Sequence, residues 1–173
     1  MTLLDKITFF ENIFSQEDFE KIHEYILTPN WSFGHYSDEN STHKMFWNLD
    51  LSNTKYFNDY LFSVISNITN RNWKVERIYA NGQTYGLDGS FHIDSDKGYT
   101  FLYYCNKEWN PSWAGNTIFI DETTNQIESI CPKPNRAILF PGNILHYGQS
   151  PSRDFYGLRV TIAYKLYPDE IYF

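Results

Sequence analysis

Phe91-His92-Ile93-Asp94-Ser95-Asp96 is the stretch around which the rest of the sequence can be arranged. Side chains of an extended segment alternate between two faces, so His92 and Asp94 are expected on the same side. An imidazole and a carboxylate on one face can bind the same metal ion. A single His-x-Asp pair also arises by chance, so its meaning depends on whether the chain supplies further ligands.

From Trp73 onward, on both sides of this stretch, the sequence is a succession of strand-like segments. Clusters of Gly, Pro, Asn and Asp separate them. Short strands in such a succession are typical of a mainly β (α+β) fold, the double-stranded β-helix or jelly roll, which encloses a cavity between two sheets. The expected strands are 74–79, 90–94, 99–106, 116–121, 127–131, 136–140, 145–148 and 158–166.

The N-terminal part, about 1–72, carries the expected helices and a few short strands. Ser15 with an acidic residue three positions later predicts the start of a helix that ends near Ile26. A one-sided apolar stripe predicts a second helix over 54–68. We therefore expect one domain over 1–173, with the helices packed on one sheet of a jelly-roll core at about 73–166.

Composition and charge argue against several classes of protein. The 173-residue chain has a net charge of −7, which disfavours a nucleic-acid or anionic-membrane surface. No apolar run approaches the ~18 residues of a membrane span, and the N-terminus lacks signal-peptide features. Cys105 and Cys131 form no metal-binding spacing and are expected as reduced thiols. The expected location is cytoplasmic, without a nucleic-acid or membrane partner, and the oligomeric state is not readable.

Two residues in the second half of the chain extend the His-x-Asp pair. His146 ends an apolar segment, where a single histidine is more typical of a hydrogen-bonded core position. Arg159 stands within an apolar strand, and burying a guanidinium is costly unless it meets an anion. Thr161 and Ala163 share the face of Arg159 and are small, so the pattern indicates space for a carboxylate there.

Together these residues suggest a metal centre with open coordination positions. His92, Asp94 and His146 are the combination that suits non-haem Fe(II) in oxygen chemistry. A structural zinc site would more often be closed by four Cys-rich ligands, whereas a catalytic zinc with the same three ligands remains an alternative. The Arg159 guanidinium favours iron with a dicarboxylate cosubstrate.

In this order and on these strands, the residues resemble the Fe(II)- and 2-oxoglutarate-dependent dioxygenases, most closely the prolyl 4-hydroxylase-like branch. The resemblance covers roughly 73–166. Three short motifs add to it: Tyr79-Ala80-Asn81-Gly82-Gln83-Thr84-Tyr85 resembles the family's Tyr-x-x-Gly-Gln-x-Tyr strand, Leu102-Tyr103-Tyr104-Cys105-Asn106-Lys107-Glu108-Trp109 its Tyr-Tyr-Leu-Asn-x-x-Trp segment, and Ala114-Gly115-Asn116-Thr117 its Gly-Gly-x-Thr.

The resemblance implies a role for each matching residue. The iron ligands would be His92, Asp94 and His146, and Arg159 would pair with the distal carboxylate of 2-oxoglutarate. The other residues implied around the cosubstrate are Tyr104 as a hydroxyl donor, Leu102 and Thr117 as lining, and Tyr79 as a second tyrosine contact. Core packing is the alternative for both tyrosines. The implied cofactors are Fe(II), 2-oxoglutarate and O2, with ascorbate as a further candidate.

The implied reaction is hydroxylation of a C–H bond with release of succinate and CO2. A protein or peptide substrate, hydroxylated at a peptidyl proline, is the first expectation, and a free amino acid or other small molecule is the alternative. A non-catalytic, metal-binding jelly-roll protein is the rival from another class. The chain departs from the family pattern at Ala114, which replaces a glycine, and at an insertion over 86–89. These departures leave the predicted iron site intact, and 34–48 and 84–91 are candidate lids.

Overall fold

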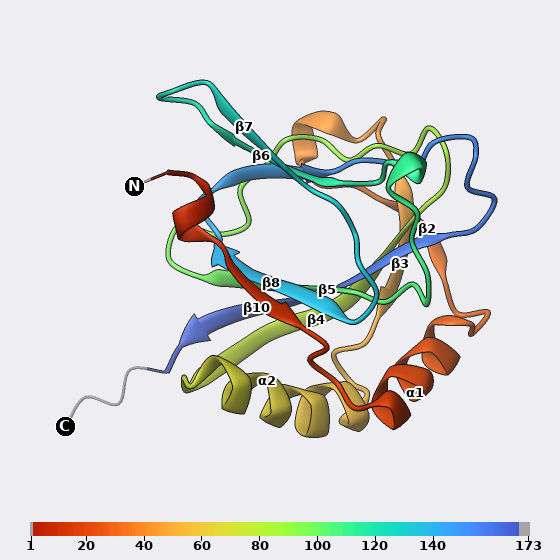
Figure 1. Ribbon diagram of the computed structural model, residues 1–173, viewed down its shortest axis with the longest axis vertical. Coiled ribbons are helices and arrows are strands. Elements are labelled where there is room, and N and C mark those ends of the chain that lie inside the picture. The colour runs from red at the N-terminus through yellow and green to blue at the C-terminus, as the bar shows by residue number, and fades with distance from the viewer. Residues whose placement is uncertain (1, 170–173) are drawn as a thin grey trace.

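In the computed structural model, which describes residues 2–169, strands form two sheets that face each other. The main sheet has seven strands in the order β1-β8-β5-β10-β4-β3-β2, and the minor sheet has three in the order β7-β6-β9. Figure 1 shows β6 and β7 over one face of the main sheet and α1 and α2 over the other. This is the expected jelly roll with helices on one sheet. The strands are β1 (Thr8–Glu11), β2 (Ser32–His35), β3 (Phe46–Asp50), β4 (Trp73–Gln83), β5 (Tyr99–Tyr104), β6 (Thr117–Asp121), β7 (Gln126–Ile130), β8 (Arg136–Pro141), β9 (Leu145–Gly148) and β10 (Arg159–Pro168).

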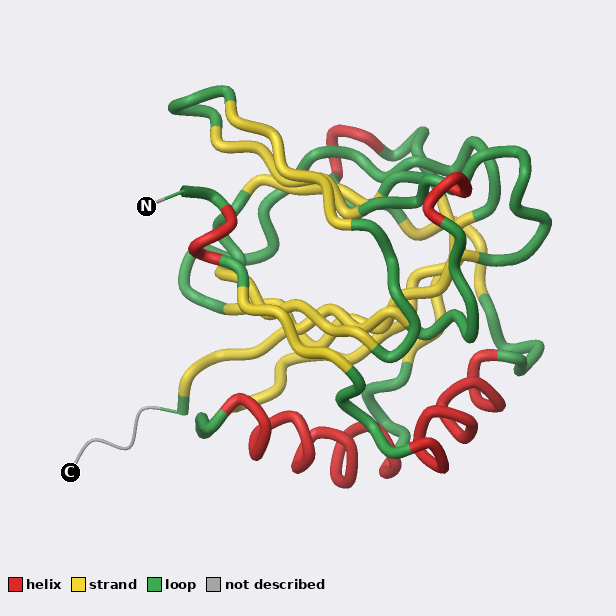
Figure 2. Tube along the Cα trace, in the orientation of Figure 1, coloured by secondary structure: helices red, strands yellow, loops and turns green. Residues whose placement is uncertain are grey.

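The helices are short, and the two longest cover the outer face of the main sheet (Figure 2). α1 begins after Ser15, whose hydroxyl accepts the N–H of Asp18, as the sequence predicted. The second predicted helix is also present, in two parts: a π-helical stretch runs directly into α2. The helical elements are η1 (Leu4–Lys6), α1 (Gln16–Ile26), η2 (Glu39–Ser41), η3 (Tyr56–Leu61), α2 (Phe62–Thr69) and η4 (Pro111–Trp113).

β10 organises the fold, because it lies at the centre of the main sheet between β4 and β5. Its side chains alternate between two layers. Val160, Ile162 and Tyr164 face the helices and pack in one buried apolar cluster with residues of α1 and α2. The Tyr164 hydroxyl donates to the carbonyl of Phe57, 3.2 Å away, and so ties the sheet to the helical layer. The other face of β10 points between the two sheets.

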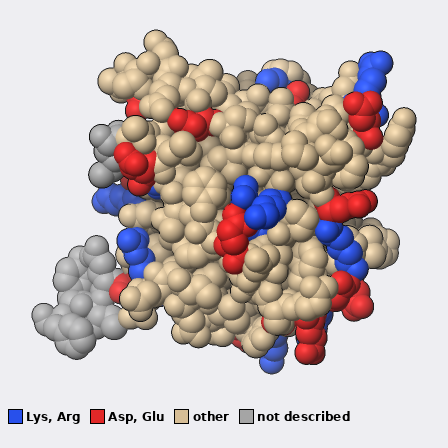
Figure 3. All heavy atoms as spheres, in the orientation of Figure 1, with Lys and Arg blue, Asp and Glu red and all other residues tan. Residues whose placement is uncertain are grey.

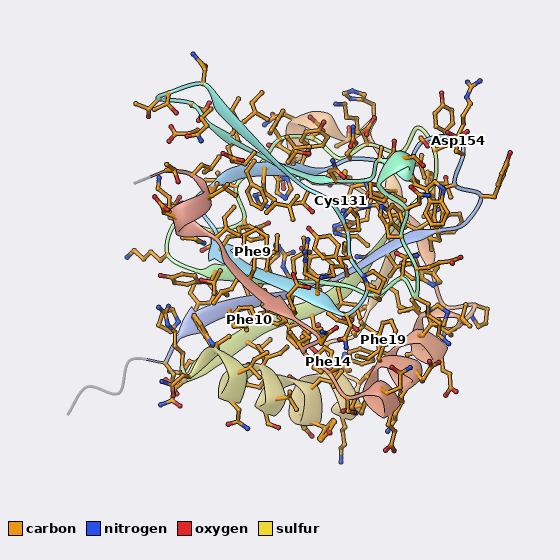
Figure 4. All side chains as sticks on the ribbon, in the orientation of Figure 1. Phe9, Phe10, Phe14, Phe19, Cys131 and Asp154 are labelled. Carbon is orange, nitrogen blue, oxygen red and sulfur yellow. The ribbon has the colours of Figure 1, made fainter. Side chains whose placement is uncertain are left out.

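Apolar side chains fill the space on both faces of the main sheet. Phe14 and Phe19 belong to the cluster between the sheet and the helices, and Phe10 packs against it (Figure 4). A second cluster lies between the two sheets and includes Phe119 of β6 and Phe140 of β8, whose rings meet edge to face at 4.9 Å. The cavity described below opens beside this second cluster.

The expected strand at 90–94 is wrong, whereas the other seven of the eight are present, with shifted ends in every case except 145–148, which matches β9. Only His92 makes a strand-type bridge, to His146. The N–H groups of Asp94 and Ser95 instead both donate to the carbonyl of Gly142, so the backbone turns here and does not continue a ladder. From the N-terminal part, β1, β2 and β3 join the main sheet at its two edges.

Cys105 and Cys131 are free thiols, the first buried and the second partly exposed. The face in Figure 3 carries dispersed acidic and basic groups and no continuous basic patch. Within residues 2–169, no helix combines the length and apolar character needed to cross a membrane.

Candidate active site

His92 and His146 are held opposite each other by two backbone hydrogen bonds. The N–H of each residue donates to the carbonyl oxygen of the other, at 3.0 Å in both directions. Their Nδ1 atoms lie 2.8 Å from the carbonyl oxygens of Ser90 and Ile144. When Nδ1–H donates to such a carbonyl, the Nε2 atom keeps its lone pair for a ligand. Both Nε2 atoms face the same small space.

Asp94 completes this group of potential ligands. Its backbone N–H donates to the carbonyl of Gly142 at 2.7 Å, which fixes the turn after His92. Its Oδ1 atom lies 3.3 Å from Nε2 of His92, and its Oδ2 atom lies 3.3 Å from Nε2 of His146. One ligand atom from each of the three residues lies within 4.8 Å of the others. The structure thus brings together the three residues that the sequence singled out.

A buried cation neutralises the Asp94 carboxylate. Lys165 forms an ion pair with Oδ2 of Asp94, and the Thr100 hydroxyl donates to the same oxygen. Burial would raise the pKa of Asp94, but the ammonium and the two imidazoles outweigh it and hold that pKa below its usual range. Burial lowers the pKa of His146, so its imidazole is neutral near pH 7. Neutral imidazole and ionised carboxylate are the forms that bind metals.

The floor of the site is the inner face of β4 and β10, which pair in antiparallel register. The inward-facing residues of these two strands line one cavity of about 140 Å³. The small side chains of Thr161 and Ala163 leave its centre open, as the alternation in the sequence predicted. The facing pairs, from one end of the floor to the other, are Gln83 and Arg159, Asn81 and Thr161, Tyr79 and Ala163, and Arg77 and Lys165.

Arg159 lies at the end of the floor away from Lys165 and is only 1% exposed. Its guanidinium donates to the carbonyl of Gly115, to Oε1 of Gln83 at 2.8 Å and to the Thr117 hydroxyl at 3.4 Å. All three acceptors are neutral, and within residues 2–169 no carboxylate lies within 4 Å of it. Burial lowers the pKa of Arg159 to about 10, so the group is still cationic at neutral pH. A buried cation in this position calls for an anion in the cavity.

The remaining predicted residues divide into those that reach the cavity and one that lies behind its wall. Leu102, Thr117 and Tyr79 line the cavity. Tyr104 is fully buried, and its hydroxyl lies 2.8 Å from that of Thr117. Burial raises the pKa of Tyr104 to about 12, so the hydroxyl keeps its proton. Tyr104 therefore contacts the cavity through Thr117.

The comparisons with known proteins agree with this geometry. The model of the 2OG-Fe(II) oxygenase superfamily matches residues 77–164, which is half of the chain and spans all three potential ligands and Arg159. The chain belongs to this superfamily. Its metal and cosubstrate are therefore Fe(II) and 2-oxoglutarate, and it is a 2-oxoglutarate-dependent dioxygenase. No match was found among curated protein sequences.

Solved structures of oxygenases share the fold at low sequence identity. One is a 2OG-Fe(II) oxygenase family protein from Burkholderia pseudomallei (TM-score 0.73, 9% identity, 94% of this chain and 85% of that one). Another is a prolyl hydroxylase from Trichoplax adhaerens in complex with a hypoxia inducible factor peptide (TM-score 0.72, 17%, 95% and 84%). A third is HygX from Streptomyces hygroscopicus with nickel, 2-oxoglutarate and hygromycin B bound (TM-score 0.64, 9%, 95% and 83%).

The residues present fit the metal of this superfamily. Two imidazoles and one carboxylate converge from a turn and from β9, and their spacing leaves one side of the group facing the cavity. These three residues would hold the ion and would leave some of its coordination positions open for other ligands. Neither Cys105 nor Cys131 lines the cavity, so the described residues offer no thiolate that would favour a closed zinc site.

Sequence reasoning missed Lys165, the residue that contacts Asp94 most closely. The signal was available, since Lys165 continues the alternation that places Arg159, Thr161 and Ala163 on one face of β10. Thr100 was missed as well, because a threonine in an apolar strand is common in cores. Gln83 belongs to a quoted motif, but its contact with Arg159 depends on the pairing of β4 with β10 and is not visible locally.

Ala114, where the family pattern has a glycine, adopts a backbone conformation that favours glycine. Its φ is +55° and its ψ is −131°, a combination that costs a non-glycine residue ~1–3 kcal/mol. We expect Ala114→Gly to raise the free energy of unfolding by about 1 kcal/mol, after the larger entropy of glycine in the unfolded chain is subtracted. Urea denaturation measures this. The matched control is Ala137→Gly on the regular strand β8, where a loss of stability is expected. A similar loss in both variants would contradict the strain at Ala114.

Proposed function

We propose that this oxygenase hydroxylates a C–H bond of a peptidyl proline and releases succinate and CO2. The observation that carries the proposal is a single cavity with potential metal ligands near one end and a buried cation at the other. His92, Asp94 and His146 stand near one end, and the unpaired guanidinium of Arg159 lies at the other. A dicarboxylate that reaches the metal with one end would bring its second carboxylate to Arg159.

In this proposal His92, Asp94 and His146 hold Fe(II). The iron, when bound, supplies the redox chemistry that couples 2-oxoglutarate, O2 and the substrate. Lys165 and Thr100 hold the Asp94 carboxylate in one orientation through their contacts with Oδ2. The carbonyls of Ser90 and Ile144 fix the tautomer of the two imidazoles.

Arg159 binds and orients the distal carboxylate of 2-oxoglutarate. A guanidinium presents parallel N–H donors that match a carboxylate, and the interior position excludes competing water. The Thr117 hydroxyl lies next to the guanidinium, and the Tyr104 hydroxyl lies next to that of Thr117. The role of Tyr104 as a hydrogen-bond donor at the Arg159 end of the cavity stays a prediction. Leu102 and Tyr79 line the cavity between the two ends.

The size of the cavity supports a substrate that lies across the opening. A volume of about 140 Å³ corresponds to roughly ten water-sized sites at ~10–15 Å³ each, which 2-oxoglutarate with its ten non-hydrogen atoms would nearly fill. Only a small group of the substrate can therefore enter. Ile93, which lines the cavity and is 49% exposed, and Phe91, which is 43% exposed, offer apolar contacts beside the metal ligands. A proline ring on an extended peptide meets these conditions.

The experiment is mass spectrometry of a panel of proline-containing peptides incubated with the protein, Fe(II), 2-oxoglutarate, O2 and ascorbate. The expected result is the mass gain of one oxygen atom on proline, with an equal amount of succinate. Identical peptides with pipecolate or alanine in place of proline are the matched controls. Succinate without any modified peptide would exclude the proline substrate but keep the oxygenase.

A small-molecule substrate is the second candidate, favoured by the similarity to the HygX structure, in which hygromycin B is bound. The same assay with free amino acids separates it from the peptide substrate. A non-catalytic metal-binding protein is the remaining alternative. It predicts neither succinate nor a modified product at any substrate concentration, with Fe(II) and 2-oxoglutarate present.

Lys165→Met should lower the stability of the metal-free protein more than that of the metal-loaded protein. Without a metal, the variant leaves a buried carboxylate with no ammonium partner, and breaking a buried ion pair costs ~3–5 kcal/mol. A divalent cation bound by Asp94 would replace the missing charge. The rise in Tm on adding Mn(II) should therefore be larger in the variant than in the unmodified protein.

The control for this prediction is Lys74→Met. Lys74 pairs with Asp169 on the surface at 2.7 Å, and such exposed pairs contribute ~0–1 kcal/mol. Its Tm should shift with Mn(II) as in the unmodified protein. An equal shift in Lys165→Met would show that the ammonium and the metal do not share the Asp94 carboxylate.

A further inference from the structure

Arg77 is a cation on the cavity wall that neither the metal nor 2-oxoglutarate uses. It lies on β4 directly opposite Lys165 of β10, and opposite residues of antiparallel strands have Cα atoms only ~4.5–5.5 Å apart. Both residues line the cavity. Because Lys165 contacts Asp94, Arg77 stands beside the metal end of the cavity, at its exposed side.

The charges that line the cavity do not balance. The charged lining residues are Arg77, Asp94, Arg159 and Lys165, three cations and one carboxylate. Lys165 is paired with Asp94, and the proposed function pairs Arg159 with 2-oxoglutarate. Arg77 is left over: within residues 2–169 no carboxylate lies within 4 Å of it, although the chain has 21 acidic and only 14 basic residues.

The Tyr79 ring lies next to the Arg77 guanidinium. The guanidinium lies 5.3 Å from the centre of this ring, an arrangement that leaves its N–H donors free at the edge. The His35 ring packs 5.7 Å from the same tyrosine. His35, Arg77 and Lys165 line the same cavity. Burial lowers the pKa of His35, and the charges of Arg77 and Lys165 lower it further. That cavity carries a positive potential.

We infer that Arg77 is a specificity-determining residue that binds a carboxylate of the substrate close to the carbon that reacts. This inference rests on the proposed function. In a peptide the carboxylate would belong to an aspartate or glutamate next to the target proline. In a small molecule it would be the carboxylate of a free acid. Glutamine or amide analogues of the same shape lose the charge and should bind weakly.

Binding to the protein loaded with Mn(II) and 2-oxoglutarate tests this without turnover. The probes are fluorescein-labelled peptides with proline flanked by glutamate, and the same peptides with glutamine, measured by anisotropy. A hydrogen-bonded charge pair at this position should favour the glutamate peptide by about 10-fold. Arg77→Met should reduce this preference to within about 2-fold, Arg77→Lys should keep part of it, and Arg77→Glu should reverse it.

Arg71→Met is the matched control. Arg71 is also an exposed arginine beside aromatic rings, those of Trp73 and Tyr99, but it does not line the cavity. The control should keep the full preference for glutamate. Because Arg77 is exposed, its variants should fold, and thermal unfolding checks this.

A second arm uses free amino acids and their amides, detected by competition with the labelled peptide. Stronger binding of the acids, lost in Arg77→Met, would support a carboxylate from a small molecule. Equal binding of acid and amide in both arms, or a preference that persists in Arg77→Met, would overturn the inference. Peptides that bind through Arg77 but gain no oxygen would instead exclude the proposed proline reaction. Hydroxylated proline without dependence on Arg77 would leave that reaction intact.

Discussion

Asp94→Ala, and separately His92→Ala, should abolish divalent-metal binding and the turnover of 2-oxoglutarate that occurs without substrate. One carboxylate oxygen of Asp94 lies 3.3 Å from Nε2 of His92, and the other lies 3.3 Å from Nε2 of His146. Either substitution therefore removes one of the three ligands and opens the ligand group to water. Loss of residues that merely support a ligand already lowers metal affinity by ~10–100-fold, and loss of a ligand should exceed about 100-fold. Mn(II) titration and succinate release measure the two effects.

Asp96→Ala is the control for these variants. Asp96 is the other carboxylate of the 91–96 stretch, but it is exposed and does not line the cavity. Its variant should bind Mn(II) normally. Removal of Asp94 also strands the Lys165 ammonium in the interior, so the double variant Asp94→Ala, Lys165→Met separates loss of a ligand from loss of folding. Full succinate release by either single variant would exclude the proposed ligand set.

Two local patterns made part of the candidate site predictable from the sequence. His92 and Asp94 are two residues apart, and alternation on β10 separates Arg159, Thr161 and Ala163 from the apolar face that packs on the helices. Alternation needs no knowledge of partners. The same alternation places Lys165 on the cavity face of β10, two residues after Ala163.

Features that depend on pairing between distant segments could not be predicted in this way. His92 pairs with His146 by a single bridge, and the neighbouring N–H groups turn toward Gly142, so extended-looking sequence at 90–94 gives no strand. The contact of Arg159 with Gln83 joins residues 76 positions apart. Such long-range contacts follow from sheet order, which local pattern leaves open.

Arg77 illustrates a different limit. On sequence alone it is one more charged residue on a strand, where solvation is the ordinary expectation. Its place becomes meaningful only when β4 and β10 pair and bring it opposite Lys165 on the cavity wall. The charge balance of the cavity, and not the residue type, then singles it out.

Arg159→Ala should raise the concentration of 2-oxoglutarate needed for half-saturation by at least ~30-fold. The guanidinium is fully buried and contacts only neutral acceptors, so the distal carboxylate of 2-oxoglutarate would be its one charged partner. Truncating one partner of a buried charge pair costs ~2–5 kcal/mol. Arg159→Met keeps more of the side-chain volume and should show a similar loss. Arg71→Ala, outside the cavity, is the control and should leave the half-saturation value unchanged.

A ligand without the distal carboxylate separates recognition of that group from a general disturbance of the cavity. 2-Oxopentanoate has the same keto-acid end as 2-oxoglutarate but ends in a methyl group. The unmodified protein should bind 2-oxoglutarate far more tightly than 2-oxopentanoate, because the latter leaves Arg159 buried without an anion. Arg159→Met should lose most of this discrimination, since it removes the cation that distinguishes the two ligands. If the variant weakened both ligands equally, Arg159 would support the cavity wall through Gly115 and Gln83 and would not bind the cosubstrate.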